Sequence, residues 1–220
     1  MPARVRLLVS ERYAAANPRN DYTETAWTGK GETMAKSGES RDRLAGILRR
    51  ESIRRGHFVL ASGRTSDYYL DCRRTTLHPE GAYLVGVEVL EAIARRGWKA
   101  VAVGGLSLGA DPIAAATAVV SHLQGTPVSA FLVRKEAKSH GTGQRIEGAP
   151  PAGSAVVIVE DVITTGGSSL VALEACREAG LPVAGLVAIV DRQEGGRENL
   201  EAQGLAVEAL YTAQELLAAE

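Results

Sequence analysis

The residue types best suited to chemistry gather in one stretch, residues 156–169, which reads VVIVEDVITTGGSS. Its apolar start predicts a buried strand that ends in two adjacent acids, Glu160 and Asp161. A turn rich in hydroxyls and glycine, Thr164–Ser168, then leads into a predicted helix. Ligands of open α/β folds bind at the carboxyl ends of strands, and a helix start presents free N–H groups and the positive end of its dipole. The stretch therefore predicts a site for a phosphate.

The two carboxylates need another partner than the phosphate, because like charges repel. The vicinal hydroxyls of a ribose fit, so we interpret residues 160–168 as a ribose 5-phosphate cradle, called the cradle below. Glu160 and Asp161 would hold the hydroxyls, and Thr164–Ser168 would hold the phosphate. Neither a Walker A ending nor a Gly-x-Gly-x-x-Gly pattern is present. The alternative is an acidic strand end followed by an ordinary helix N-cap.

A long basic segment, residues 134–151, interrupts a chain whose connections are otherwise short; we call it the lid segment. Loops of this length inside a compact domain are usually functional lids or disordered. Cations on a closing loop could neutralise an anionic leaving group while excluding water. The alternative is a basic surface loop without a role. Its basic residues are Arg134, Lys135, Lys138, His140 and Arg145.

Two further segments combine polar residues with expected strand ends. In Gly104–Pro112 a strand ends in a glycine-rich turn, and Asp111 with Pro112 is predicted to begin a helix as N-cap and first residue. A plain strand-to-helix turn explains this segment equally well. In Asp191–Gly196 the planar guanidinium of Arg192 suits a carboxylate. The alternative is a solvent-facing Arg192 paired with Glu194.

The elements that must position these residues follow from apolar periodicity and turn residues. A helix from Ser40 to about Gly56 precedes a hairpin of strands 57–61 and 67–72, a small accessory element that we expect to form a hood. A helix over Pro79–Arg96 should stop at Gly97 in a left-handed cap. Alternating strands and helices then predict an α/β fold with a mainly parallel sheet flanked by helices. These are strands 100–104, 128–133, 155–159, 183–190 and 206–211 and helices 112–123, 168–179 and 212–219.

The first 39 residues are polar and lack a helical or strand period, so we expect a disordered extension before a single domain, residues 40–220. Because Met34 precedes the regular pattern, we hypothesise that residues 1–33 are either a dispensable extension or an artefact of start-site choice. No second domain is expected after Glu220.

Composition limits the class of protein. The chain has 220 residues, enough for one well-buried domain, and a formal net charge of -1, so no global field recruits nucleic acid. Cys72 and Cys176 form no disulfide framework and indicate a reducing compartment. No apolar run is long enough for a membrane span. We therefore expect a cytoplasmic protein that binds neither nucleic acid nor membrane.

The motif at 156–169 resembles the phosphoribosyl pyrophosphate (PRPP) signature of the type I phosphoribosyltransferases. Three more segments, GHFVLASGRTSDYYLD at 56–71, VRKEAKSHGTG at 133–143 and VDRQEGG at 190–196, resemble the orotate phosphoribosyltransferases in order and spacing. The resemblance covers residues from about 44 to the C-terminus. It implies the type I phosphoribosyltransferase fold and transfer of ribose 5-phosphate from PRPP to orotate, in pyrimidine (UMP) biosynthesis.

The resemblance also implies roles for single residues. Lys138, His140 and Asp161 would be catalytic, and Thr164 and Arg192 would bind orotate. No direct metal ligand is assigned, because Mg²⁺ would arrive carried by PRPP. The residues implied to bind PRPP are Arg134, Lys135, Lys138, His140, Glu160, Asp161, Val162, Ile163, Thr164, Thr165, Gly166, Gly167 and Ser168.

The family further implies a homodimer, with Arg134 acting in its own subunit and Lys135, Lys138 and His140 serving the neighbour. Two departures stand out: many relatives carry Lys where this chain has Ala61 and Gly109. Two alternatives stay open from sequence, namely a purine enzyme of the same fold and a PRPP-sensing regulator that binds DNA or RNA.

Overall fold

The computed structural model describes residues 38–59, 65–136, 145–148 and 150–218. By their contacts these residues belong to one unit, Lys36–Glu220. The predicted extension, residues 1–39, lies outside the described residues except for its last two positions. Its disorder therefore stays a prediction.

A six-stranded sheet in the order β5-β4-β3-β6-β7-β8 forms the centre of this unit. Five strands run parallel and the two-residue β5 pairs antiparallel with β4, so the predicted mainly parallel sheet is confirmed. The strands are β3 (Ala102–Leu106), β4 (Ser129–Val133), β5 (Ile146–Glu147), β6 (Val156–Ile163), β7 (Val183–Asp191) and β8 (Val207–Thr212).

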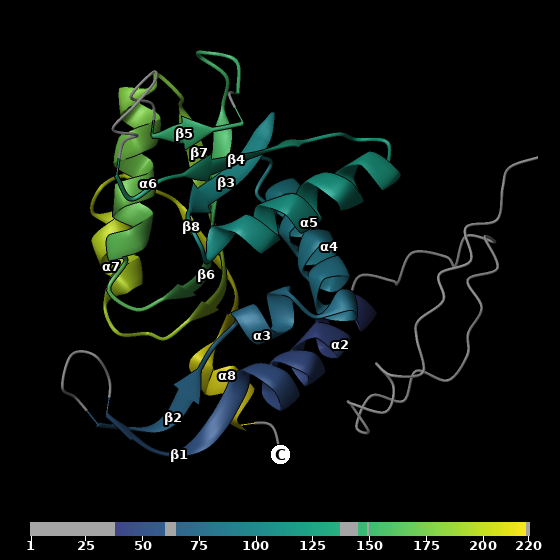
Figure 1. Cartoon of the computed structure of the whole chain (residues 1–220), viewed down its shortest axis with the longest axis vertical. Coiled ribbons are helices and arrows are strands. Elements are labelled where there is room, and N and C mark those ends of the chain that lie inside the picture. The colour runs from purple at the N-terminus through teal and green to yellow at the C-terminus, as the bar shows by residue number, and fades with distance from the viewer. Residues whose placement is uncertain (1–37, 60–64, 137–144, 149, 219–220) are drawn as a thin grey trace, which may run out of the picture. The chain divides into compact units, whose positions relative to one another are not determined.

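Helices cover both faces of the sheet (Figure 1). On one face lie α4 (Pro79–Arg95) and α5 (Ala110–Leu123), and on the other lie α6 (Gly167–Glu178) and α7 (Gly196–Glu201). The predicted cap after α4 is present, because Gly97 has a positive φ of 65°. This doubly covered sheet directs the carboxyl ends of its parallel strands toward one edge.

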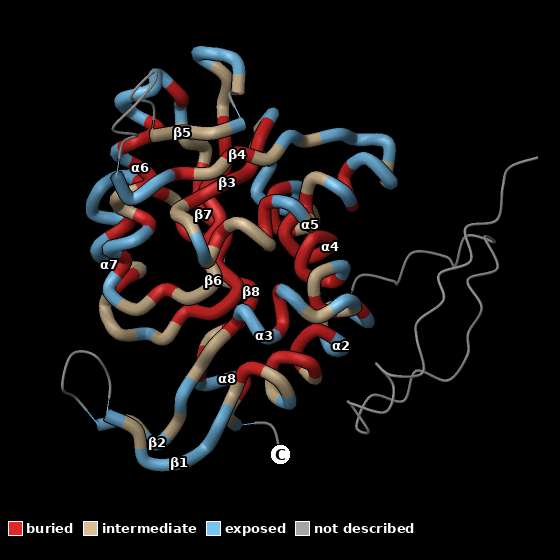
Figure 2. The backbone as a smooth tube through the Cα atoms, in the orientation of Figure 1, coloured by how far each residue is buried: buried red, intermediate tan, exposed pale blue. Residues whose placement is uncertain are grey.

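The alternation of side chains along β6 explains why two cores form. Val157 and Val159 pack with α4 and α5, whereas Val156 and Ile158 pack with α6. All four residues are fully buried, and Figure 2 shows the sheet strands as the most continuously buried part of the backbone. A strand buried on both faces reads as a continuous apolar run, which is typical of parallel sheets.

The hood consists of an antiparallel hairpin, β1 (Ile53–Val59) and β2 (Thr65–Leu70), beneath the sheet in Figure 1. Before it come α2 (Glu39–Ile47) and a short π-helix η1 (Leu48–Ser52); α3 (Arg73–Thr76) follows it, and α8 (Ala213–Ala218) packs nearby. The hairpin is confirmed. Its first strand begins four residues earlier than predicted, so the preceding helical stretch ends at Ser52 instead of Gly56.

Two predicted helix caps are wrong. Ser40 lies inside α2, fully buried, where its hydroxyl donates to Glu88 on α4 at 2.5 Å. Asp111 lies inside α5, whose N-cap is Gly109. In both cases a tertiary or turn partner takes the polar side chain, because the helix starts one or two residues earlier than expected.

Candidate functional site

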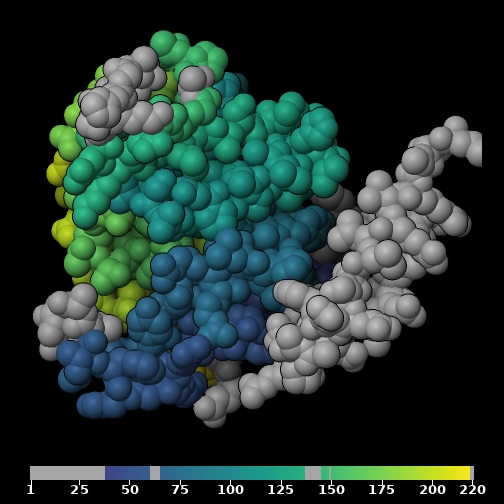
Figure 3. Space-filling view, viewed as in Figure 1, coloured from purple at the N-terminus to yellow at the C-terminus, as the bar shows by residue number. Residues whose placement is uncertain are grey.

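A cavity of about 380 Å³ opens at the carboxyl edge of the sheet. In Figure 3 the green surface around β6 and α6 is bordered by the blue surface around α3 and the teal surface around α5. The cavity thus collects side chains from the hood, from the β3–α5 loop and from the ends of β6 and β7. Its lining residues are Tyr69, Leu70, Asp71, Cys72, Arg73, Leu106, Ser107, Leu108, Gly109, Glu160, Asp161, Val162, Thr164, Ser168 and Arg192.

The cradle lies at this edge, although β6 is longer than predicted. The strand continues to Ile163 because its parallel pairing with β7 extends to Ile163 and Asp191, whereas pairing with β3 ends at Ile158. The acids therefore lie where β6 has lost its β3 neighbour and one side of the strand faces the cavity. Gly166, with φ 84°, turns the chain into α6, which has 12 residues and begins three residues after Thr164.

The turn of the cradle is supported from behind by α7. Asn199 donates its side-chain amide to the carbonyl of Thr165 at 3.1 Å. A Cβ on Gly196 would lie 2.6 Å from the carbonyl oxygen of Thr164 and 3.0 Å from the nitrogen of Gly166. This close backbone approach requires glycine at 196. The turn is thereby held against movement away from the cavity.

Burial governs the protonation of Glu160. Its side chain accepts a hydrogen bond from the Ser169 hydroxyl at 2.8 Å, and its residue is only 6% exposed. Burial raises the pKa of Glu160 from 4.5 to about 8, and the negative charge of Asp161 acts in the same direction. Burial therefore favours the neutral form of the Glu160 carboxyl at pH values where a solvent-exposed glutamate is ionised.

Asp161 connects the cradle with the loop that precedes α5. One carboxylate oxygen accepts the backbone N–H of Val162 at 2.9 Å. A Cβ on Gly109 would lie 2.7 Å from that same oxygen, so the carboxylate packs against the bare backbone of the loop. In the loop itself the Ser107 hydroxyl donates to Asp111 at 2.9 Å. The α5 helix thus points its positive N-terminal end at the cavity, as α6 does.

Arg192 lies beside the cradle because backbone pairing places it there. Its N–H donates to the carbonyl of Ile163 at 2.9 Å, one residue before Thr164. The guanidinium stacks 4.8 Å from the ring centroid of Tyr68 and pairs with Glu194 at 2.7 Å. The side chain is 9% exposed, so the alternative of a solvent-facing pair is right about the partner and wrong about exposure.

Sequence reasoning missed an ion pair in the cavity wall, Asp71 with Arg73. The carboxylate accepts Nε and Nη2 of the guanidinium at 2.8 and 3.1 Å. This hydrogen-bonded Arg73 holds the pKa of Asp71 below its usual value. The signal available in the sequence was the acid-x-Arg spacing at the end of the predicted strand 67–72. The four residues of α3 are too few to show the apolar periodicity by which a helix is recognised in a sequence.

The lid segment is described only at its two ends. Arg134 pairs with Glu147 at 2.9 Å, and Arg145 pairs with Glu178 of α6 at 3.2 Å. Arg134 and Lys135 are exposed and do not line the cavity. Lys138 and His140 lie outside the described residues, so their positions stay predictions.

The predicted ligand-binding residues separate into those that line the cavity and those that shape the turn behind it. Among the lining residues are Glu160, Asp161, Val162, Thr164, Ser168 and Arg192, while Ile163, Thr165, Gly166 and Gly167 do not line it. The roles of all these residues stay predictions, since a position at the cavity does not assign one.

Three broader properties concern the described residues only. No three or more His, Cys, Asp or Glu side chains among them form a group that could hold a metal ion. None of their helices combines the length and apolar character needed to cross a membrane. Cys72 and Cys176 are both buried and carry no disulfide, and burial raises the pKa of both thiols.

Known proteins resemble this chain along most of its length. Residues 78–203 match the phosphoribosyl transferase domain family. The orotate phosphoribosyltransferase of Aquifex aeolicus is 46% identical over 180 residues, covering 80% of this chain and 97% of the relative.

Solved structures give the same result. Orotate phosphoribosyltransferase of Mycobacterium tuberculosis in complex with Fe(III) dicitrate superposes with a TM-score of 0.72 at 44% identity, covering 80% of this chain and 98% of the other. The same enzyme in complex with PRPP has a TM-score of 0.69 at 40% identity, with equal coverage.

Proposed function

The chain belongs to the orotate phosphoribosyltransferase family, and from that premise we propose that it transfers ribose 5-phosphate from PRPP to N1 of orotate. The products are orotidine 5′-phosphate and pyrophosphate, a step of pyrimidine (UMP) biosynthesis. One observation carries the proposal: a single cavity holds the acids of β6, the start of α6 and the guanidinium of Arg192. The acids suit the sugar hydroxyls, the start of α6 suits the phosphate, and the guanidinium suits a base that carries a carboxylate.

The residues act mainly by position and charge. The transition state of such a transfer is oxocarbenium-like, so the protein must orient the ribose and stabilise separated charge. Glu160 and Asp161 accept hydrogen bonds from the ribose hydroxyls, and the turn Thr164–Ser168 with the N-terminus of α6 binds the 5′-phosphate. Arg192 binds the orotate carboxylate through the planar fork of its guanidinium, with Thr164 beside the base.

Selection of orotate over purines follows from Arg192. Adenine and hypoxanthine carry no carboxylate, so they would leave the guanidinium without an ionic partner from the ligand. Stacking on Tyr68 and pairing with Glu194 fix the guanidinium before the base arrives, which reduces the entropy lost on binding.

Mg²⁺ is proposed to enter with PRPP, chelated by its pyrophosphate and ribose oxygens. The neighbouring carboxylates of Glu160 and Asp161 in the cavity lining fit an ion that brings most of its own ligands. The ion would supply neutralisation of phosphate charge. These two carboxylates would be its nearest protein partners, and binding would favour the ionised form of Glu160.

The lid segment is proposed to close over the leaving pyrophosphate. Lys138 and His140 would assist its departure, Arg134 would act in its own subunit, and Lys135 with Lys138 and His140 would serve the neighbour in a homodimer. Mixing a Lys138→Ala protein with an Asp161→Asn protein tests the sharing. A shared lid restores activity to about a quarter of the sites in randomly reassembled dimers, whereas a lid that serves its own subunit restores none.

The activity itself is tested by incubating the protein with PRPP, Mg²⁺ and each base in turn. We expect loss of orotate absorbance and no nucleotide from adenine or hypoxanthine. Tight PRPP binding without turnover of any base would contradict the proposed enzyme and favour a regulator. A cytoplasmic location, proposed from the two free, buried cysteines, is tested by cell fractionation.

A further inference from the structure

We propose that Arg73 is an additional substrate-binding residue, that its guanidinium binds the pyrophosphate group of PRPP, and that Asp71 positions it. The inference rests on the proposed function, because it takes PRPP as the ligand. It assigns to the hood a direct part in the reaction. The argument combines the place of Arg73, the charges around it and the way it is held.

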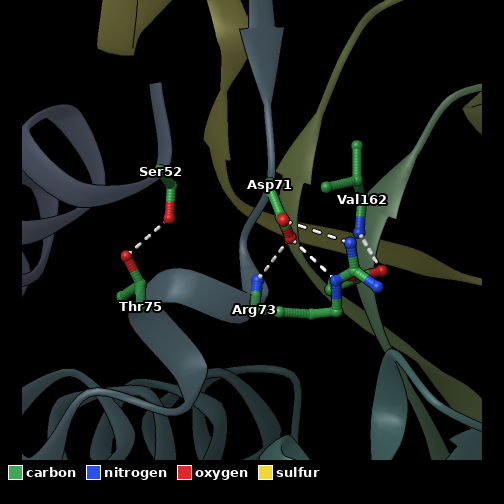
Figure 4. A network of polar contacts seen from close by, with 6 residues as sticks. Ser52, Asp71, Arg73, Thr75 and Val162 are labelled. Atoms are coloured by element: carbon green, nitrogen blue, oxygen red, sulfur yellow. Dashed lines mark hydrogen bonds and ion pairs between the residues drawn. The ribbon is translucent and has the colours of Figure 1, made fainter. Parts of the chain in front are cut away.

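Arg73 stands on a fixed turn at the cavity wall. It begins α3, three residues after the end of β2 and two residues after Asp71. Figure 4 shows its side chain extending past Asp71 toward Val162 of β6. The turn is anchored on its other side, where the hydroxyls of Ser52 and Thr75 lie 2.7 Å apart and the N–H of Asp71 donates to the carbonyl of Ser52 at 3.0 Å.

Of the two cationic residues in the described cavity lining, only Arg73 remains to bind the leaving pyrophosphate. The described lining contains the acids Asp71, Glu160 and Asp161 and the cations Arg73 and Arg192. Arg192 is proposed to bind the orotate carboxylate, and its side chain is only 9% exposed. Arg73, with a side chain 51% exposed, can therefore meet a bound anion without first being uncovered.

The pyrophosphate fits the position of Arg73 better than the 5′-phosphate does. The 5′-phosphate is assigned to the start of α6, and the ribose to the acids that precede it on β6. The negative charge of Asp161 acts on Arg73, and the carboxylate of Asp161 packs against Gly109 at the start of α5. Arg73 and the positive end of α5 thus flank Asp161, where the group on C1 of the ribose must lie.

Asp71 orients Arg73 without using all of its donors. The pair engages Nε and Nη2, and a guanidinium has five N–H donors, so further donors can bind phosphate oxygens. Asp71 is therefore a positioning residue. Its bidentate contact fixes the plane of the guanidinium before the ligand arrives.

The test separates the two anionic parts of PRPP by titrating the full-length protein with Mg²⁺-pyrophosphate and, separately, with ribose 5-phosphate. In Arg73→Gln we expect pyrophosphate affinity and kcat/KM for PRPP to fall roughly 10- to 100-fold, with ribose 5-phosphate affinity and the KM for orotate unchanged. Arg74→Gln is the matched control, because Arg74 is its exposed neighbour and does not line the cavity; it should leave all four quantities unchanged.

Asp71→Asn keeps the side-chain shape and removes the charge that orients Arg73. We expect a smaller loss of pyrophosphate affinity in the same direction, again without change for ribose 5-phosphate. Equal losses for both ligands, or no loss in Arg73→Gln, would overturn the proposal. If the unmodified protein converts no base, the proposed function fails, while the two titrations still decide the contact between Arg73 and pyrophosphate.

Discussion

Two carboxyl groups in the cavity lining, Glu160 and Asp71, have pKa values shifted in opposite directions. On the β6 wall, the part of the cavity lining that contains Glu160 and Asp161, burial raises the pKa of Glu160 to about 8, although the hydrogen bond from the Ser169 hydroxyl acts in the opposite direction. The part of the cavity lining that contains Arg73 and Arg192 is called the arginine wall below. There, Asp71 accepts hydrogen bonds from Arg73, which lowers the pKa of Asp71 below its usual value. Deep burial without a strong counter-charge and partial burial with one therefore shift the pKa values of these two carboxyls in opposite directions.

This difference indicates how the site is divided before any ligand arrives. The arginine wall holds ready-made ion pairs, Arg73 with Asp71 and Arg192 with Glu194. On the β6 wall, burial favours the neutral form of Glu160, so we expect this group to ionise when a cationic or hydrogen-bonding ligand stabilises its charge. We therefore expect substrate anions to bind to charge that is already in place, and the proposed sugar-binding side to become charged as the ligand binds.

The largest expected effect comes from breaking the arginine wall at its base end. Arg192→Ala should lower kcat/KM for orotate roughly 100- to 1,000-fold, because it removes the buried guanidinium proposed to bind the orotate carboxylate. Affinity for PRPP should change little, as measured by titration in the absence of orotate. An equal loss for both substrates would show that Arg192 supports the whole site and does not select the base.

A smaller loss is expected from crowding the β6 wall. A Cβ at position 109 would lie 2.7 Å from a carboxylate oxygen of Asp161, so Gly109→Ala should displace that carboxylate and lower kcat by up to about 100-fold. Gly46→Ala is the control, since this α2 glycine has no atom near its would-be Cβ and alanine favours helix. Normal turnover in Gly109→Ala would show that the position of the Asp161 carboxylate does not limit the reaction.

The smallest effect sharpens the comparison of the two walls through pH. The pKa of Glu160 is raised on folding, so this group contributes stability that is fully present below about pH 4.5 and is lost as pH rises through about 8. Chemical denaturation across this range should show unfolding free energy falling with pH. In Glu160→Gln, which stays neutral, that component should be absent. An unchanged slope would place the pKa of Glu160 near its ordinary value.

Local sequence signals predicted the central fold and much of the cavity. The buried run before Glu160 and the glycine turn after it specify β6, the cradle and α6 within one short stretch, so few distant contacts are needed to recognise them. The end of β6 was placed too early, at Val159, because adjacent acids usually end a strand. Pairing with β7 carried the strand on to Ile163, which only tertiary structure reveals.

Other features depend on contacts between distant segments. Ser40 finds Glu88 across 48 residues, a partner that no local pattern indicates. The short helices α3 and α7 have the mostly polar sequences RRTT and GRENLE, which show no apolar period, so neither was predicted. Arg73 was missed for the same reason. Sequence showed an arginine after a strand and could not show that the hood brings it to β6.

The close packing of Gly196 against the cradle turn has a consequence for evolution and design. Residues 191–196 contain Arg192, which is proposed to select the base, and end in the glycine that packs closely against Thr164 and Gly166. An exchange of this segment to accept another base would also alter the floor beneath the phosphate turn unless position 196 stays glycine. We therefore expect base preference to diversify at positions 192 and 194, since Gly195 has a positive φ of 88° and Gly196 packs against the turn proposed to bind the phosphate.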